Sequence, residues 1–125
     1  MANPNIVNVT AIYANNSLTA LTTNTATSLV NNLANSGKIY KINTIVVTNV
    51  DGTTTSPITI NVYSANNLLG TAYPIANTIP VPINSTLIVV DKATSFYLKE
   101  NQSIGAIASS ANDHVIVCSW EEMNS

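Results

Sequence analysis

The sequence contains few charged residues. Only 8% of its 125 residues are Asp, Glu, Lys or Arg, whereas soluble domains commonly carry about 25%. The cations are four lysines, arginine is absent, and the formal net charge is −2. Such a chain has little with which to neutralise phosphates, so nucleic acid is not an expected partner. Low charge also leaves little repulsion between neighbouring copies, which favours a protein that works in a packed assembly.

Cysteine, glycine and long apolar runs are scarce as well. Cys118 is the single cysteine, which excludes a disulfide within the chain, and the four glycines are isolated, so there is no glycine-rich phosphate loop. No apolar run approaches the roughly 18 residues of a membrane helix. The first ten residues lack the basic and apolar regions of a secretion signal. We therefore expect a soluble protein, made in a cytoplasm, with no membrane partner.

The chain does contain enough apolar residues for one core. Hydrophobic residues make up 46% of the sequence, and its length suits a single domain. Residues 1–5 are polar and include a proline, which is typical of a flexible arm. We expect residues 1–13 to form an N-terminal arm or a first strand, and residues 14–125 to form a β-sandwich domain.

Short runs of Val, Ile, Thr and Tyr, bounded by Asn, Gly, Asp, Ser or Pro, recur along the chain and indicate strands. We expect strands near residues 6–13, 26–31, 38–50, 57–64, 73–80, 86–91, 95–98, 103–109 and 114–122. For residues 14–37 a short strand followed by a loop is the preferred interpretation, and a helix is the alternative. The pattern predicts an all-β fold: a single antiparallel β-sandwich of about eight strands with jelly-roll or other Greek-key topology.

Three of these runs support more specific expectations. Residues 38–50 and 57–64, joined by the Asp-Gly turn of DGTTT, predict a half-buried antiparallel hairpin. The unbroken apolar run of TLIVVD at 86–91 predicts a central strand that is covered on both sides. The prolines in and beside residues 73–80 predict an edge strand, because proline cannot donate to a sheet.

The C-terminal stretch HVIVCSWEEMNS gathers reactive residue types that the rest of the chain nearly lacks. In a strand, His114, Cys118 and Trp120 share one face. At about 3.4 Å per residue, His114 and Cys118 are roughly 13–14 Å apart, too far for a nucleophile and its base. Glu121 and Glu122 point to opposite faces and form no carboxylate pair. We predict a packed final strand with an acidic end in water and no catalytic residue.

Metal ligands are scattered along the chain. One His, one Cys and six carboxylates show neither zinc spacing nor a calcium loop. A calcium site assembled from loop carbonyls is the remaining alternative. The carboxylates are Asp51, Asp91, Glu100, Asp113, Glu121 and Glu122. We expect no metal, no cofactor and no cofactor-binding residue. Core and interface packing explain the aromatic residues, and a sugar-stacking platform is the alternative.

Two stretches carry a shared pattern: KIYKINTIVVTNVDGTTTSPITINVY and TIPVPINSTLIVVDKATSFYLKENQSIGAIASSANDHVIVCSWEE. The pattern consists of a Lys-x-Tyr strand, Asn-x-Asp-Gly, Leu-x-Val-x-Asp, Tyr-Leu-x-Glu and a terminal SWEE. Over residues 26–122 it resembles small virion structural proteins of tailed bacteriophages, especially marine and cyanobacterial phages. The resemblance implies a β-sandwich that decorates or cements a capsid, or a neck or tail part, and it transfers no functional residue.

These observations predict a non-enzymatic virion protein, assembled in the host cytoplasm. We expect a capsid decoration or cement protein that stabilises the outer capsid surface by binding the major capsid protein or another virion protein. A neck, tail or fibre component is one alternative, and a carbohydrate-binding β-sandwich module is an alternative of another class. Low charge and a proline-marked edge predict a homo-oligomer, with a trimer favoured and a dimer next.

Overall fold

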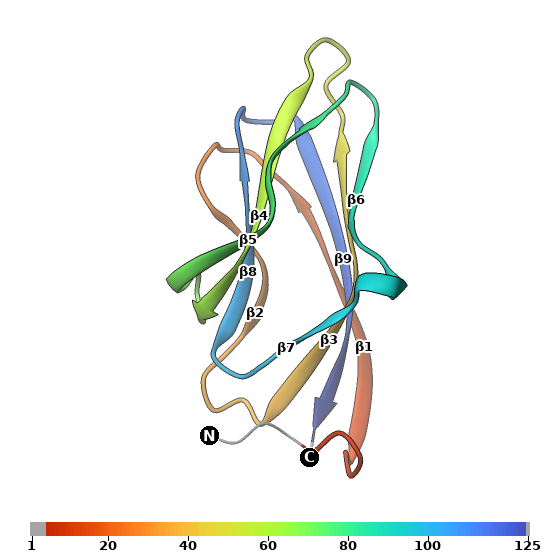
Figure 1. The fold of residues 1–125 in the computed structure, drawn as a ribbon, viewed down its shortest axis with the longest axis vertical. Helices are drawn as coiled ribbons and strands as arrows, with labels where there is room; N and C mark the ends of the chain where they lie inside the picture. The colour runs from red at the N-terminus through yellow and green to blue at the C-terminus, as the bar shows by residue number, and fades with distance from the viewer. Residues whose placement is uncertain (1–4, 125) are drawn as a thin grey trace.

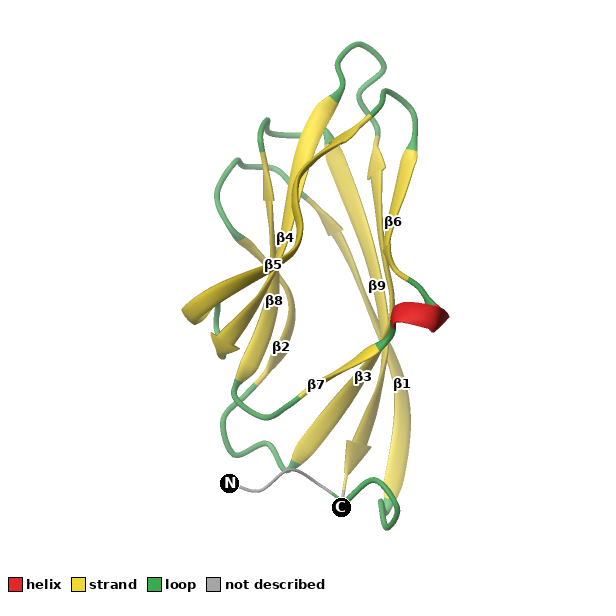
Figure 2. Cartoon of the chain, viewed as in Figure 1, coloured by secondary structure: helices red, strands yellow, loops and turns green. Residues whose placement is uncertain are grey.

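Two antiparallel β-sheets pack face to face in the computed structural model, which describes residues 5–124 (Figures 1 and 2). The strands are β1 (Ala11–Ala20), β2 (Thr27–Asn32), β3 (Lys38–Asn49), β4 (Ser56–Ala65), β5 (Leu69–Val81), β6 (Thr86–Val90), β7 (Phe96–Leu98), β8 (Gln102–Ala108) and β9 (His114–Asn124). Between β6 and β7 lies one 3₁₀ turn, η1 (Lys92–Thr94). No helix among the described residues is long and apolar enough to cross a membrane. The predicted all-β sandwich is confirmed.

The strand order is that of a jelly roll. Sheet A has the order β1-β9-β3-β6, and β7 also pairs with β3; sheet B has the order β2-β8-β4-β5. All pairs are antiparallel. When β6 and β7 are taken as two halves of one strand interrupted by η1, each sheet has four strands, and the chain crosses between the sheets as in a jelly roll. Of the Greek-key topologies expected, this is the one present.

The expected hairpin between the third and fourth strands is wrong. β3 lies in sheet A and β4 in sheet B, so the connection after Asn49 carries the chain across the top of the sandwich (Figure 1). The buried Asn49 side chain directs this crossing: its Nδ2 donates to the carbonyl oxygens of Thr54 and Val81, both at 2.9 Å. Buried backbone acceptors need such partners, and the amide supplies one to the buried Val81 while its second bond holds Thr54 of the exposed turn.

The expectation of a central strand at residues 86–91 is also wrong. β6 is the outer strand of sheet A along the main path, and among residues 5–124 its sheet partner is β3. Ile88 faces away from the core and is 61% exposed, while Leu87 and Val89 are half-buried. A strand formed by a continuous apolar run has two apolar faces. Whether other parts of the protein cover both faces depends on tertiary packing. The edge position predicted for residues 73–80 is confirmed, because β5 is the outer strand of sheet B.

The first strand begins later than the sequence pattern indicated. β1 spans Ala11–Ala20 and pairs with β9 along its whole length, whereas the expected strand covered residues 6–13. The preferred strand at 26–31 is found as β2, and the helical alternative is wrong. Residues 5–10 precede β1, and residues 1–4 of the expected arm lie outside the described residues.

The core lies between the two sheets, which face each other in Figure 2. It is built from buried, mostly aliphatic side chains. Residues with no exposed surface include Ile42, Ile45, Val47, Ile58, Ile60, Leu98, Ile104 and Ile116. Burying each such side chain contributes roughly 1.5–3 kcal/mol. The β-branched residues that indicated strands in the sequence therefore also contribute much of the core.

Asparagine takes the place of glycine in the turns. Seven described non-glycine residues have positive φ, and five of them are asparagines: Asn35, Asn67, Asn84, Asn101 and Asn112. Asparagine tolerates the left-handed region because its short side chain can bond to nearby backbone. The chain thus forms a turn-rich fold with few glycines.

Candidate functional site

The structure places the reactive residues of β9 inside the sandwich. His114, Cys118 and Trp120 share the inward face, as their spacing predicted, and all three are buried. The imidazole Nε2 of His114 donates to the carbonyl oxygen of Ser56 at 3.0 Å. This bond links β9 of sheet A to β4 of sheet B. His114 therefore links the two sheets and does not face an opening that a substrate could enter.

Cys118 is a core residue with an inert thiol. It has no exposed surface. Burial raises the pKa of its thiol to about 11, against a smaller opposing effect of the Ser17 hydroxyl. The thiolate is the nucleophilic and metal-binding form of cysteine. At neutral pH the Cys118 thiol is protonated and enclosed, so it serves packing.

The two final glutamates differ from the expected acidic end in water. They do point to opposite faces, but Glu122 faces inward and is buried, while Glu121 is half-buried on the outer face. Glu122 accepts hydrogen bonds from Asn15 Nδ2 at 2.6 Å, Trp120 Nε1 at 3.1 Å and Lys38 Nζ at 3.4 Å. Burial alone would raise the pKa of this carboxyl, but these donors outweigh it and hold the pKa below its ordinary value.

An aromatic pair closes the same cluster. The rings of Tyr40 and Trp120 stack with centroids 6.0 Å apart. Burial, and secondarily the charge of Glu122, raises the pKa of the Tyr40 phenol. The Glu122 carboxylate accepts from donors on β1, β3 and β9, so both of its oxygens have a partner. This cluster joins three strands of sheet A and offers no free acid or base.

The described residues provide no cluster for a metal ion. Among residues 5–124, no three His, Cys, Asp or Glu side chains gather closely enough to hold one. The carboxylates in that part of the chain do not gather into such a cluster. A calcium site built mainly from loop carbonyls stays a prediction.

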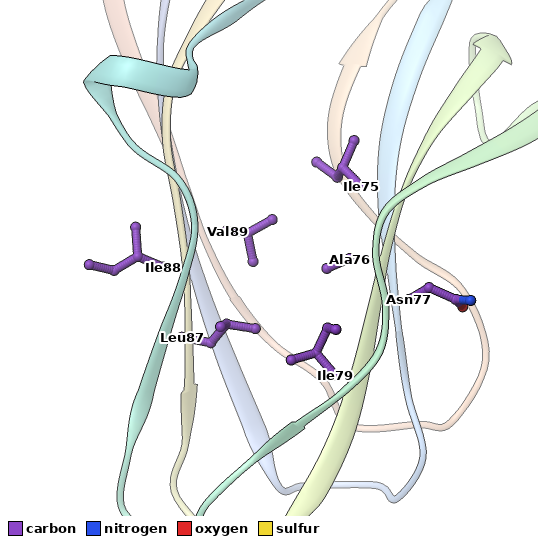
Figure 3. A pocket seen from close by; sticks show the side chains of 7 residues that line it. All are labelled: Ile75, Ala76, Asn77, Ile79, Leu87, Ile88 and Val89. Atoms are coloured by element: carbon purple, nitrogen blue, oxygen red, sulfur yellow. The ribbon is translucent and has the colours of Figure 1, made fainter.

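An apolar groove opens between β5 and β6, the edge strands of the two sheets (Figure 3). Its volume is about 310 Å³, and it is lined by Ile75, Ala76, Asn77, Ile79, Leu87, Ile88 and Val89. Ile75, Ile79 and Val89 are among the side chains that point into the space, whereas Asn77 and Ile88 point away (Figure 3). Ile75 is 42% exposed and Ile79 is 37% exposed. The hydrophobic core therefore reaches solvent on this side.

The backbone of β5 explains why the groove is open. The register of β5 against β4 shifts on both sides of Ile60, and Thr78 adopts a φ of 52°. The Thr78 amide donates to Thr59 Oγ1 at 2.9 Å, which holds the irregular segment in place. Bulges of this kind bend a strand and twist it away from its neighbours. The sequence marked β5 as an edge strand by its prolines, but it placed β6 in the sheet centre and so missed the groove.

The exposed tyrosines form no common platform. Tyr13, Tyr73 and Tyr97 are each at least 45% exposed. Tyr13 lies on β1 and Tyr97 on β7, with β9 and β3 between them, while Tyr73 belongs to the other sheet. Sugar recognition by stacking needs aromatic faces side by side, and these three lie on separate parts of the surface.

Comparison with known proteins identifies a fold and no family. No protein-family model and no curated protein matches the sequence. A chain of the Bacillus endospore appendages, which form disulfide-linked pili, is similar in structure with a TM-score of 0.53, 22% identity, and 90% of this chain and 88% of that chain covered. A chain of the acidic-stable capsid of Helicobacter pylori bacteriophage KHP30 is similar with a TM-score of 0.51, 16% identity, and coverage of 92% and 89%. A chain of the cyanophage Pam1 capsid aligns with a TM-score of 0.40, 15% identity, and coverage of 100% and 93%.

Proposed function

We propose that the chain is a non-enzymatic structural protein of a bacteriophage virion, which assembles in the host cytoplasm and acts by binding other virion proteins. The observation that carries the proposal is the apolar groove between β5 and β6, the outer strands of the two sheets. Such a groove accepts aliphatic side chains of a neighbour, while the strand edges offer backbone hydrogen bonds. The likeness in fold to a phage capsid chain agrees with this role. His114, Cys118 and Trp120 of β9 are buried, so these side chains present no exposed catalytic set.

The favoured position is the outer surface of the capsid. A decoration or cement protein gains its effect from many equal contacts, each weak, that together hold neighbouring capsid subunits. A chain with 8% charged residues can pack against many neighbours with little electrostatic cost. The partner is then the major capsid protein. A neck, tail or fibre position uses the same groove at a lower copy number.

A pilus held together by disulfides is a poor match for this chain. The endospore appendages that share the fold are disulfide-linked. Here Cys118 is the single cysteine, and its thiol is buried with a raised pKa. Thiol–disulfide exchange requires access and a thiolate. Association between copies must therefore depend on non-covalent surfaces.

Quantitative mass spectrometry of purified particles tests the proposal directly. A decoration protein is expected in a fixed ratio to the major capsid protein, close to one copy or one oligomer per repeating capsid unit. A neck or tail protein is expected at a few copies per particle. Absence from particles, together with glycan binding by the isolated protein, would overturn the virion role in favour of a carbohydrate-binding module.

The groove itself is tested by Ile75→Glu, with Ile83→Glu as the matched control. The two isoleucines are 42% and 43% exposed, but Ile83 does not line the groove. A carboxylate in the groove should weaken binding to particles on the order of 100-fold, which corresponds to the loss of one buried anchor. The control variant should bind as the wild type does. Equal binding by both variants would show that the groove is not the contact.

A further inference from the structure

An apolar row crosses the outer face of sheet A, opposite the core. Its members are cross-strand partners on four successive strands: Leu18 on β1, Val117 on β9, Val46 on β3 and Ile88 on β6. Cross-strand partners point to the same side of a sheet. Leu18 is 75% exposed, Val117 44% and Ile88 61%. We call these four residues the outer row.

A charged row lies parallel to the outer row on the same face. Lys41 of β3 is the cross-strand partner of Glu121 on β9, and Tyr97 of β7 is its partner on the other side. Ser119 and Thr44 form the uncharged row in between. The face thus presents one apolar row, one small polar row, and one row in which a cation and an anion lie side by side on the two central strands.

We infer that this face binds a second copy of the same chain around a two-fold axis. The axis runs parallel to the strands, between β3 and β9. Rotation about it lays β9 of one copy over β3 of the other, and each row falls on its own equivalent. Val117 then meets Val46 of the other copy, and Leu18 meets Ile88. In a two-fold interface, every such contact occurs twice.

Charge complementarity identifies the occupant as a second copy. The same rotation places Lys41 of each copy against Glu121 of the other, so both charged groups gain an opposite partner. A partner that presented a uniformly acidic or basic surface would repel one of the two. The pairing needs no third subunit, because the cation and the anion are exchanged between two copies. A three-fold axis would not bring the outer row of one copy against the outer row of another copy.

The rest of the face is compatible with close approach. The turn η1 projects on the outer side of sheet A, at the β6–β7 edge (Figure 2). In the two-fold arrangement it meets the β1 edge of the other copy. The exposed β1 residues at that level, Ala14 and Asn16, are small. The outer row is thus covered at its centre, where anchors contribute most to affinity.

Val117→Glu tests the apolar contact, with Val50→Glu as the matched control. Val117 lies at the centre of the face, and Val50, which is 53% exposed, lies in the β3–β4 connection outside it. Sedimentation equilibrium of the wild type should show a dimer. Val117→Glu should raise the dimer dissociation constant by at least about 100-fold, since each dimer carries the change twice. Val50→Glu should leave it unchanged, and both variants should retain the wild-type thermal midpoint at low concentration.

A charge exchange tests the two-fold arrangement. Lys41→Glu or Glu121→Lys alone places like charges against each other twice in every dimer, and should weaken dimerisation on the order of 10-fold at low salt. The double exchange, Lys41→Glu with Glu121→Lys, should restore the wild-type mass. A wild-type monomer at the highest soluble concentration would overturn the inference. So would a double exchange that fails to restore a dimer while remaining folded.

This inference rests on the proposed structural role, but the two can fail separately. A dimer in solution that is absent from particles would refute the virion role and keep the two-fold interface. A protein that is monomeric, is found stoichiometrically in particles, and loses particle binding on Val117→Glu would keep the virion role. In that case the face would belong to another virion protein, and the dimer would be refuted.

Discussion

Buried polar side chains link the strands of this protein: His114 and Asn49 link the two sheets, and Glu122 links three strands of sheet A. His114 bonds across the sandwich to the Ser56 carbonyl, Asn49 bonds two carbonyls at the sheet crossing, and Glu122 collects three donors. A buried polar group is costly without partners and stabilising with them. Each of these side chains therefore specifies where one backbone segment must lie, which apolar packing alone does not.

Cys118 should be unreactive in the native protein. Because the thiol has no exposed surface and a pKa of about 11, an aromatic disulfide reagent at neutral pH should react only after unfolding. Cys118→Ala should retain particle binding and lower the free energy of unfolding by about 1 kcal/mol, as small core truncations do. Labelling of the folded protein at the rate seen in denaturant would contradict the buried placement.

Glu122 should make stability depend on acid pH. Its pKa in the folded protein lies below the ordinary value of 4.5, because its donors outweigh the effect of burial. The stabilisation is then fully present above pH 4.5 and is lost as the pH falls through the folded pKa. Glu122→Gln should cost about 1–3 kcal/mol at pH 7, since charge-assisted bonds are lost. The difference between the variant and the wild type should shrink below pH 4.5, as measured by denaturant unfolding at each pH; a constant difference would contradict the assignment.

At the scale of the elements, the sequence predicts strands well and their partners poorly. Alternation and turn residues located β2, β4 and β9 closely, because these signals are local. The Asp-Gly turn after β3 suggested a hairpin, yet β3 and β4 belong to different sheets. The difference arises from Asn49, whose buried amide bonds the crossing backbone. In an asparagine-rich chain, the residues around Asn49 do not indicate that its side chain will bond to the crossing backbone.

Asn49→Ala should be far more damaging than a change at an exposed asparagine. The substitution leaves the carbonyls of the buried Val81 and of the exposed Thr54 without these bonds. It should lower the free energy of unfolding by about 1–3 kcal/mol, because an unpaired buried acceptor, here the Val81 carbonyl, costs roughly that much. Asn24→Ala, at an exposed position, should cost less than about 0.5 kcal/mol. Chemical denaturation of both variants measures the two free energies of unfolding. Equal decreases in the two variants would contradict the proposed role of the Asn49 amide.

At the scale of the whole molecule, the jelly roll leaves two uncovered apolar surfaces that point in different directions. The groove lies between the edges of the two sheets, and the outer row lies on the far side of sheet A. The two surfaces lie on opposite sides of β6: Ile88 points away from the groove and belongs to the outer row (Figure 3). The sequence predicted self-association from its low charge and its proline-marked edge strand. It could not locate either surface, because both depend on which strands become neighbours and which edge is left open.

The N-terminal residues should contribute to assembly while the domain folds without those that precede β1. Ile6 and Val7 are exposed, at 46% and 85%, whereas β1 pairs with β9 from Ala11 onward. Deleting residues 2–10 should therefore shift the thermal midpoint by no more than a few degrees. The same deletion should weaken binding to particles markedly, since an exposed apolar segment is available to add to the open edge of a neighbour.

Extending the deletion to residue 20 provides the control for that experiment. The longer deletion removes β1 together with Asn15, a donor to Glu122, and it uncovers the edge of β9 along its whole length. It should destabilise the free domain by several kcal/mol, as large losses of packed surface do. If the short deletion lowered the midpoint as much as the long one, residues 2–10 would belong to the folded core. If the short deletion left particle binding intact, they would have no part in assembly, and the groove and the outer row would have to account for all of it.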